Sequence, residues 1–316
     1  MAFVGPRRRT YSIAANIVSR VATQAVMLRA LCIYNQHAGR ALTCLEEVRL
    51  QLGRHGYEVE FKPTAYPLHA IELARHAAAG NADLVIAAGG DGTVNEVACG
   101  LALSTVPLAV LPCGTSNVLA KELGMPNRIP DAVHLIPRSK PTRIALGKGG
   151  GRYFVMMAGV GVDAQILYGL NAKVKRAFGE AGLWLQALRH WVTRYRLAPF
   201  SVDVDGKAHQ ATFAIISRVG WYAGGVKITS RADLRSDQFD VCIFKGTSRL
   251  DYLRYLSGVL SGTHPHFHDV VYTRGTLVRM TAEDQIRVQM DGEIAGTLPM
   301  VFEFVPDALT LLIPRP

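Results

Sequence analysis

The sequence predicts an α/β protein whose parallel sheet is followed by a second, mainly β domain. Between residues 28 and 111, short apolar runs alternate with amphipathic stretches, whereas beyond residue 147 apolar residues recur at every second position. The length of 316 residues also exceeds the usual size of a single hydrophobic core. We therefore expect helices on both faces of a parallel sheet, and then a separate β-sandwich.

The alternating elements of the first part can be assigned in chain order. Apolar, β-rich runs such as LRALCIYN and DLVIAA predict buried strands at 28–35, 57–62, 83–88 and 108–111. Amphipathic stretches predict helices at 42–52, 68–79 and 94–102. The carboxyl ends of parallel strands meet at one edge of a sheet, where ligands of open α/β sheets usually bind.

The second part is mostly strands. They are expected at 153–158, 200–204, 211–217, 239–244, 277–281, 286–290 and 300–305, interrupted by helices near 164–177, 183–196 and 251–261. Asp205-Gly206 and Asp291-Gly292 are typical of tight turns at strand ends. We expect a flexible extension at 1–27, a nucleotide-binding α/β domain at 28–147 and a β domain at 148–305.

Composition limits the function classes. Apolar residues make up 49% of the chain and charged residues 19%, an ordinary globular balance, while the net charge of +10 favours anionic partners. The basic residues are dispersed without a recognised nucleic-acid module, so nucleic acid is not expected. Five cysteines without metal-ligand spacing favour a reducing cytoplasm. No apolar run reaches the roughly 20 residues that span a bilayer, so we expect peripheral membrane contact only.

A glycine-rich loop follows the third predicted strand directly, as Gly89-Gly90-Asp91-Gly92-Thr93. Three glycines allow close backbone approach, and successive N–H groups at a helix start bind anions. Asp91 would repel a phosphate unless a cation such as Mg²⁺ bridged the two. A plain turn without ligand is the alternative, which the acidic residue and the buried strand disfavour.

A second loop follows the next strand as PCGTSN, residues 112–117. Its Gly114, Thr115 and Asn117 precede helix-like sequence, so capping that helix is an alternative role for Thr115 and Asn117. Because neighbouring strand ends share one crevice, a ligand-binding role is the better interpretation.

Five motifs in order resemble the diacylglycerol kinase catalytic family, which includes sphingosine kinases and many bacterial lipid kinases. They are NQHAG at 35–39, GGDGTVNEV at 89–97, PCGTSN at 112–117, GVGVDA at 159–164 and DGE at 291–293, so the resemblance covers residues 28–316. NAD kinases and phosphofructokinases share a GGDG-type loop, but the PCGTSN and GVGVDA blocks point away from them.

The resemblance implies an ATP-dependent lipid kinase of phospholipid biosynthesis, with ATP and Mg²⁺ bound between the two domains at a membrane surface. It also allows residues 306–316 to return to the first domain, and a homodimer stays open. Implied nucleotide contacts are Asn35, Thr64, Gly89, Gly90, Gly92, Thr93, Gly114, Thr115 and Asn117.

The same resemblance implies roles for acidic residues. Glu293 is the expected base for the lipid hydroxyl, with Asp91 serving phosphate and metal, or acting as the base instead. Asp163 and Glu96 are expected to support the site. A structural cation of bacterial relatives lies near a DDG-like turn, to which Asp233 and Asp237 are nearest here.

Three positions depart from the family pattern. Gln36 replaces a proline, Val118 an aspartate and Gln238 a glycine, and the last weakens the expectation of a structural metal. The glycine loop and the carboxylate of the DGE motif both match the family pattern. This favours a catalytic protein over the alternative of a non-catalytic nucleotide- or lipid-binding regulator. A kinase for a soluble substrate is a further alternative.

Two other segments have competing interpretations. The histidine-rich stretch 263–269 lacks the spacing of a zinc site, so a solvated loop is expected there. The aromatic and basic residues at 184–196 either pack on the β domain or contact lipid.

Overall fold

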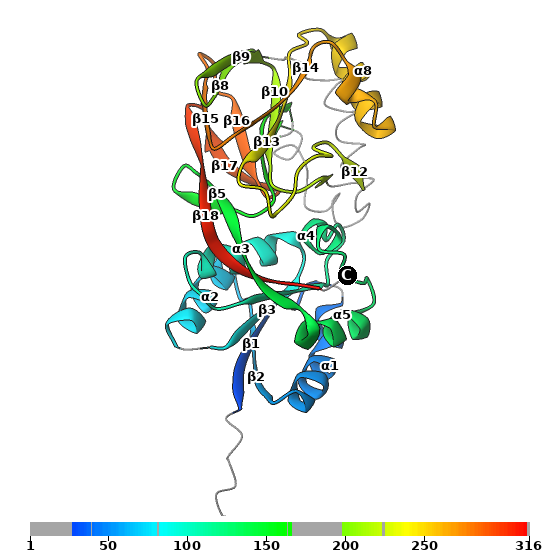
Figure 1. Ribbon diagram of the computed structural model, residues 1–316, viewed down its shortest axis with the longest axis vertical. Coiled ribbons are helices and arrows are strands. Elements are labelled where there is room, and N and C mark those ends of the chain that lie inside the picture. Colours follow the sequence, from blue (N-terminus) through cyan, green and yellow to red (C-terminus); the bar gives the residue numbers. More distant parts are fainter. Residues whose placement is uncertain are drawn as a thin grey trace, which may run out of the picture.

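Two domains are stacked along the long axis of the molecule, an α/β domain and a β-sandwich (Figure 1). The computed structural model describes residues 27–38, 40–80, 82–162, 164–165, 198–222 and 225–314. The expected extension at 1–27 and helices at 164–177 and 183–196 fall almost wholly outside these residues. The predicted fold class is confirmed.

The α/β domain contains parallel strands in the order β2-β1-β3-β4. These are β1 (Leu28–Tyr34), β2 (Tyr57–Pro63), β3 (Leu84–Gly89) and β4 (Leu108–Pro112). Every residue of β3 and β4 is buried, which explains why their sequences are continuous apolar runs rather than alternating ones.

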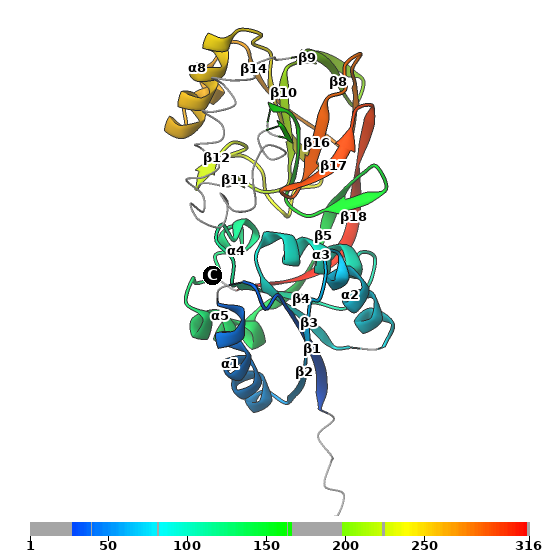
Figure 2. The same cartoon turned by 180° about the vertical axis from the view of Figure 1, so that it is seen from behind.

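Helices cover both faces of this sheet (Figure 2). On one face, α1 (Ala41–Arg54) and α5 (Ile129–Leu135) pack against side chains such as Cys32 and Ile86. On the other, α2 (His69–Ala79) and α3 (Asp91–Leu101) pack against Ile33 and Ala87. Alternate residues of one strand thus serve two cores, as the pleat of a β-strand requires.

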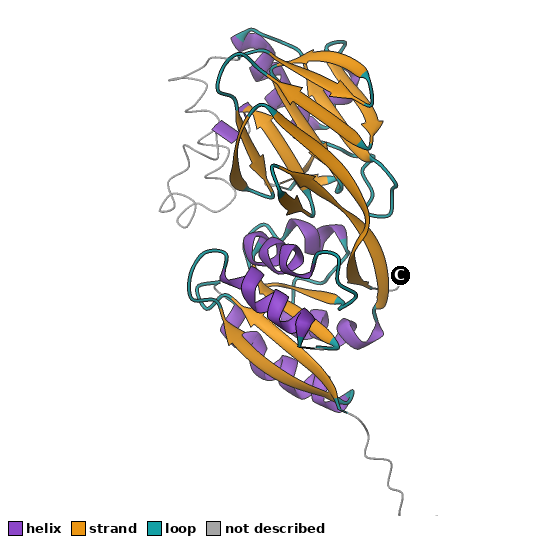
Figure 3. Ribbon diagram, turned by 90° about the vertical axis from the view of Figure 1, so that its left-hand side faces the viewer, coloured by secondary structure: helices purple, strands orange, loops and turns teal. Residues whose placement is uncertain are grey.

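The β domain packs a six-stranded antiparallel sheet, in the order β14-β13-β10-β7-β16-β17, against part of a second sheet (Figure 3). The first sheet contains β7 (Met157–Gly161), β10 (Phe213–Ser217), β13 (Phe239–Phe244), β14 (Val270–Gly275), β16 (Arg287–Met290) and β17 (Glu293–Thr297). Facing it are β8 (Phe200–Val204), β9 (Lys207–Ala211) and β15 (Leu277–Thr281).

Aromatic rings fill the space between these two layers. Phe154 contacts Phe239 and Phe302, with ring centroids 5.8 Å and 6.4 Å away. On the outer face of the six-stranded sheet, α8 (Arg249–Ser261) packs through Tyr255 against Phe244. A short ribbon of β11 (Trp221–Tyr222) and β12 (Val226–Lys227) faces the first domain.

A long strand connects the domains. β18 (Met300–Ile313) begins antiparallel to β15 and ends beside β4, where Leu311 pairs with Leu108. Along its other edge it pairs with β5 (Lys140–Gly149), which continues through a hairpin into β6 (Arg152–Phe154). Within the described residues, one ten-stranded sheet therefore passes through both domains.

Candidate active site

The loops that carry the predicted nucleotide contacts lie together at the carboxyl edge of the parallel strands. Asn35 follows β1 and donates its backbone N–H to Ala88 O of β3 at 3.1 Å. Thr64 follows β2 and donates to Tyr34 O at 2.9 Å. Main-chain hydrogen bonds from each loop to the neighbouring strand thus hold these loops at the edge of the sheet.

The glycine loop is in close contact with the PCGTSN loop. A Cβ atom on Gly114 would lie 2.4 Å from the Cα of Gly90, and one on Gly89 would lie 2.6 Å from the Thr93 side chain. Contacts that short do not occur, so these positions require glycine. The helix α3 begins at Asp91, three residues earlier than its apolar pattern predicts, so the loop supplies its first turn. Amide groups of a first helical turn bind anions.

Asn117 braces the second loop instead of capping the helix that follows it. Its Oδ1 accepts the N–H of Gly114 and its Nδ2 donates to Gly114 O, both at 2.9 Å, with Asn117 in a left-handed conformation (φ 46°). The first amide of α4 (Val118–Glu122) donates instead to Asp91 Oδ1 at 2.7 Å. Asp91 therefore connects the two loops. The two residues of this hydrogen bond are 27 positions apart, so no local sequence pattern predicts it.

The β domain contributes the DGE turn between β16 and β17. Asp291 (φ 48°) and Gly292 (φ 84°) form the tight turn that the sequence predicts. Glu293 reaches the first turn of α3, because a Cβ on Gly92 would lie 3.7 Å from Glu293 Oε1. Two carboxylates from different domains, Asp91 and Glu293, thus flank the same helix start.

Arg152 contacts the candidate site, and the sequence does not reveal this. Its guanidinium lies 3.0 Å from Glu293 Oε2, and both side chains are about one-third exposed. A single arginine after a run of glycines carries no recognisable pattern. Only the β5–β6 hairpin brings it to a residue 141 positions away.

Asp291 is the buried anchor of the turn. Its carboxylate accepts the backbone N–H groups of Val155, Met156 and Met157 at 2.7, 2.9 and 2.8 Å. Burial raises the pKa of Asp291 to about 7, although these hydrogen bonds oppose the shift, and the charge of Asp91 adds to it. The turn that carries Glu293 is thereby fixed to the start of β7.

Glu96 lies in the second turn of α3, near Glu293. Its carboxylate accepts the N–H groups of Leu68 and Ala70, at 3.0 and 3.2 Å, and so satisfies the start of α2. Burial raises the pKa of Glu96, the two N–H groups lower it, and the nearby Glu293 raises it further.

Negative charge accumulates along α3, whose last turn contains Cys99. Burial raises the pKa of Cys99 to about 12, and the charges of Asp291, Glu293 and Glu96 contribute to that shift while Arg152 opposes it. No three His, Cys, Asp or Glu side chains within the described ranges form a ready metal cage. Mg²⁺ commonly takes one or two carboxylates together with phosphate oxygens, so the residues present fit this ion.

The remaining predicted residues are less closely involved. Thr115 is exposed in the PCGTSN loop at the candidate site. Asp233 and Asp237 are exposed in the loop before β13, away from that edge, and Asp163 falls outside the described residues. The expectation of a solvated histidine loop is wrong for His264, whose side chain is buried. Its ring nitrogens lie 2.9 Å from Ile228 O and 3.2 Å from Gly258 O.

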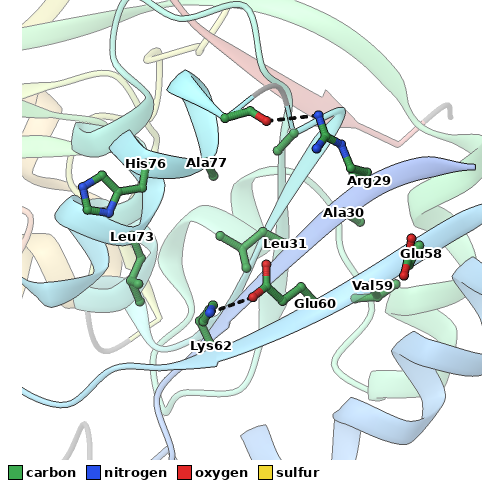
Figure 4. A pocket seen from close by; sticks show the side chains of 12 residues that line it. Arg29, Ala30, Leu31, Glu58, Val59, Glu60, Lys62, Leu73, His76 and Ala77 are labelled. Carbon is green, nitrogen blue, oxygen red and sulfur yellow. Dashed lines mark hydrogen bonds and ion pairs between the residues drawn. The ribbon is translucent and has the colours of Figure 1, made fainter.

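An open hollow of about 710 Å³ lies beside β2 and α2 (Figure 4). Its lining includes Leu31, Leu73 and His76, with an ion pair between Lys62 and Glu60 at its rim. It contains none of the predicted site residues, so the candidate site is the edge described above. No helix in the described part of the chain is long and apolar enough to cross a bilayer.

Comparisons with known proteins agree with the two-domain fold. The family model "Diacylglycerol kinase catalytic domain" matches residues 29–149, and "YegS C-terminal NAD kinase beta sandwich-like domain" matches residues 156–313. A diacylglycerol kinase of Bacillus subtilis (strain 168) is 30% identical over 296 residues, covering 92% of this chain and 97% of that protein. One from Staphylococcus aureus is 28% identical over 280 residues, covering 87% and 89%.

Solved structures share the fold. One from Bacillus anthracis has a TM-score of 0.79 at 21% identity, covering 94% of this chain and 98% of that one. A diacylglycerol kinase from the same organism has a TM-score of 0.74 at 23% identity, covering 91% and 97%.

Proposed function

The chain belongs to the diacylglycerol kinase family and is a lipid kinase, and we propose that it transfers the γ-phosphate of ATP to a hydroxyl of a diacylglycerol-like or long-chain-base lipid. One observation carries the proposal: Glu293 of the β domain stands against the first turn of α3, which follows the glycine loop. A phosphate-binding helix start and a carboxylate able to accept a proton are the two parts that this transfer requires.

The nucleotide would bind along the carboxyl edge of the parallel strands. Backbone amides at Gly90, Gly92 and Thr93 would receive the phosphates, since the glycines leave the main chain accessible. Asn35, Thr64, Gly89, Gly114, Thr115 and Asn117 would shape the surrounding loops. Asp91 would hold Mg²⁺, and a bound divalent ion would supply charge that offsets the phosphates.

Glu293 would take the proton of the lipid hydroxyl as that oxygen bonds to the γ-phosphorus of ATP, while the bond from this phosphorus to the β–γ bridging oxygen breaks and ADP leaves. Arg152 holds Oε2 of this carboxylate, while Oε1 is directed toward Gly92. Asp291 fixes the turn from behind through three backbone hydrogen bonds. The base is thereby oriented before substrate arrives, which removes part of the entropic cost of the reaction.

The protein would bind its lipid substrate at the cytoplasmic surface of a membrane, by peripheral contact. The lipid acceptor is present there, and the net charge of +10 would attract the chain to an anionic surface. The alternative of a non-catalytic regulator is disfavoured, since both Asp91 and Glu293 are retained.

Transfer of label from [γ-³²P]ATP tests the proposal. The purified protein is incubated with Mg²⁺ and mixed micelles of diacylglycerol, micelles of a long-chain base, or a soluble alcohol, with Glu293→Gln as the matched control. We expect label in a lipid phosphate, dependent on Mg²⁺ and reduced in the variant. Label only in a soluble product would contradict the lipid acceptor, and absence of transfer with every acceptor would favour the regulator.

A further inference from the structure

A buried arginine occupies the centre of the loop that precedes β13. Arg218 directly follows β10, and the residue is only 1% exposed. One terminal nitrogen donates to Ser236 O at 2.9 Å and to Gln238 O at 3.2 Å, and the other donates to Leu234 O at 2.5 Å. Three carbonyl oxygens from five consecutive residues therefore point at one guanidinium.

This guanidinium is charged at neutral pH. Burial lowers the pKa of Arg218 to about 10, while Asp233, Asp240 and Asp237 favour its charged form. The Phe304 ring lies 4.7 Å from Cζ, which adds a cation–π contact. A positive charge thus sits inside the loop, opposite carbonyl dipoles and beside three carboxylates.

The same set of oxygens is what a hard metal ion would need. Carbonyl and carboxylate oxygens are the usual ligands of Mg²⁺ and Ca²⁺. Here the guanidinium occupies the carbonyl oxygens of residues 234, 236 and 238, and Asp233 Oδ1 accepts the N–H of Arg235 at 2.8 Å. A structural cation held by Asp233 and Asp237, which the family resemblance implies, therefore does not fit this loop.

We infer that Arg218 replaces the structural cation: its guanidinium organises residues 233–240, and this loop binds no divalent metal ion. The inference concerns folding of the loop and does not depend on the proposed phosphoryl transfer.

The consequence extends to the first domain. Two residues after Arg218, the N–H of Gly220 donates to Glu122 Oε2 at the end of α4, at 2.9 Å, and Trp221 donates to the same atom at 3.3 Å. A hollow of about 420 Å³ between the domains is lined by Glu122 and by residues 233–235 of the loop. Since α4 starts at the Asp91 contact, an ordered loop supports the helix that borders the glycine loop.

The first test uses the unaltered protein without nucleotide. We expect no divalent metal above background by plasma mass spectrometry after desalting, and the same Tm in EDTA as in millimolar Mg²⁺ or Ca²⁺. A metal whose removal lowers Tm and whose binding is lost in Asp233→Asn would overturn the inference. A metal lost in Asp91→Asn but kept in Asp233→Asn leaves the loop metal-free, and so supports it.

The second test removes the internal charge. Arg218→Met keeps much of the side-chain volume, and we expect Tm to fall by roughly 10 °C, because breaking a buried charge network typically costs several times what a surface pair does. Amide exchange at 233–240 should accelerate. Arg218→Lys keeps the positive charge but lacks the planar guanidinium that reaches three carbonyl oxygens, so it should give an intermediate Tm.

Arg279→Met is the matched control. Arg279 lies 3.7 Å from Asp203 Oδ1 in the same domain, and the two side chains are 55% and 33% exposed, so its loss should shift Tm by less than about 2 °C. Equal effects of Arg218→Met and Arg279→Met would contradict a special role for Arg218. If Arg218→Met does not fold, the Tm of Arg218→Lys and the metal measurement on the unaltered protein test the inference instead.

Discussion

The two carboxylates beside the start of α3 have different partners, and this difference separates their roles. Glu293 pairs with Arg152, whereas Asp91 accepts the amide of Val118. We predict that Glu293→Gln lowers kcat by a factor on the order of 10² to 10⁴ with little change in KM for ATP, because a general base is lost. Asp91→Asn should instead weaken MgATP use, while its amide oxygen still accepts from Val118. Steady-state kinetics at varied ATP and Mg²⁺ measure both.

Asp91→Ala is the control, since it removes the hydrogen bond as well as the charge. It should lower stability by about 1 kcal/mol, which Asp91→Asn should not. A strong rise in KM for ATP with almost unchanged kcat in Glu293→Gln would make Glu293 a nucleotide contact, and Asp91 would then be the base.

Asp291 gives the protein a pH dependence of stability whose sign is fixed. Its folded-state pKa of about 7 exceeds the value of about 3.9 in an unfolded chain, so the folded protein holds the proton more tightly. This contribution is complete below about pH 4 and is lost as pH rises to about 7. The stability of the wild type relative to Asp291→Asn should therefore decline over that range by at most about 4 kcal/mol and stay constant above it. Urea unfolding at several pH values measures this; a difference that grows with pH would contradict it.

At the element scale, the contact between the glycine loop and the PCGTSN loop can be tested by substitution. A Cβ on Gly114 would lie 2.4 Å from Gly90 Cα, and because Gly90 Cα is a backbone atom, the loop would have to move to relieve the clash. We predict that Gly114→Ala separates the loops and lowers kcat/KM on the order of 10²-fold, because small displacements of positioning groups are costly.

Gly53→Ala in α1 is the matched control for that substitution. Nothing lies within 4 Å of a Cβ there, so it should leave turnover unchanged and raise stability by about 0.5–1 kcal/mol. If Gly114→Ala were as active as Gly53→Ala, close loop contact would not matter for the reaction.

The elements differ in how far the sequence predicts them. β3 and β4 are predictable because burial on both faces produces uninterrupted apolar runs. The first turn of α3 is not, because Asp91-Gly92-Thr93 has poor helix propensity and is held by its surroundings. Nor is the α4 cap predictable, since its acceptor Asp91 comes from another loop.

For the whole molecule, net charge is the property that bears on where the enzyme works. With 35 Lys and Arg against 25 Asp and Glu, the chain should bind vesicles containing anionic phosphatidylglycerol and be released by salt. Neutral phosphatidylcholine vesicles should capture less. Cosedimentation at several salt concentrations measures this, and equal, salt-independent capture by both vesicles would show that the charge plays no part.

At this scale the two-domain order follows from the sequence. The family resemblance allows residues 306–316 to return to the first domain, but the strand pattern does not predict one continuous sheet through both domains. Pro306-Asp307 interrupts the alternation and is typical of a turn, so the predicted strand stops at residue 305. In the structure that pair falls at a register shift between Val305 and Leu309, with Asp307 left-handed (φ 47°), and β18 continues. A bulge accommodates proline within a strand, which local pattern cannot distinguish from a chain reversal.

The course of β18 also determines the order of events during synthesis. Its second half pairs with β4, yet β18 is the last strand of the chain and leaves the ribosome after all the others. Until then, β4 has an unpaired edge, and the whole β domain must be made before that edge is closed. Such a distant pairing forms slowly, and an open strand edge invites association with other chains. The nascent α/β domain would therefore depend on chaperones for longer than its own simple topology requires.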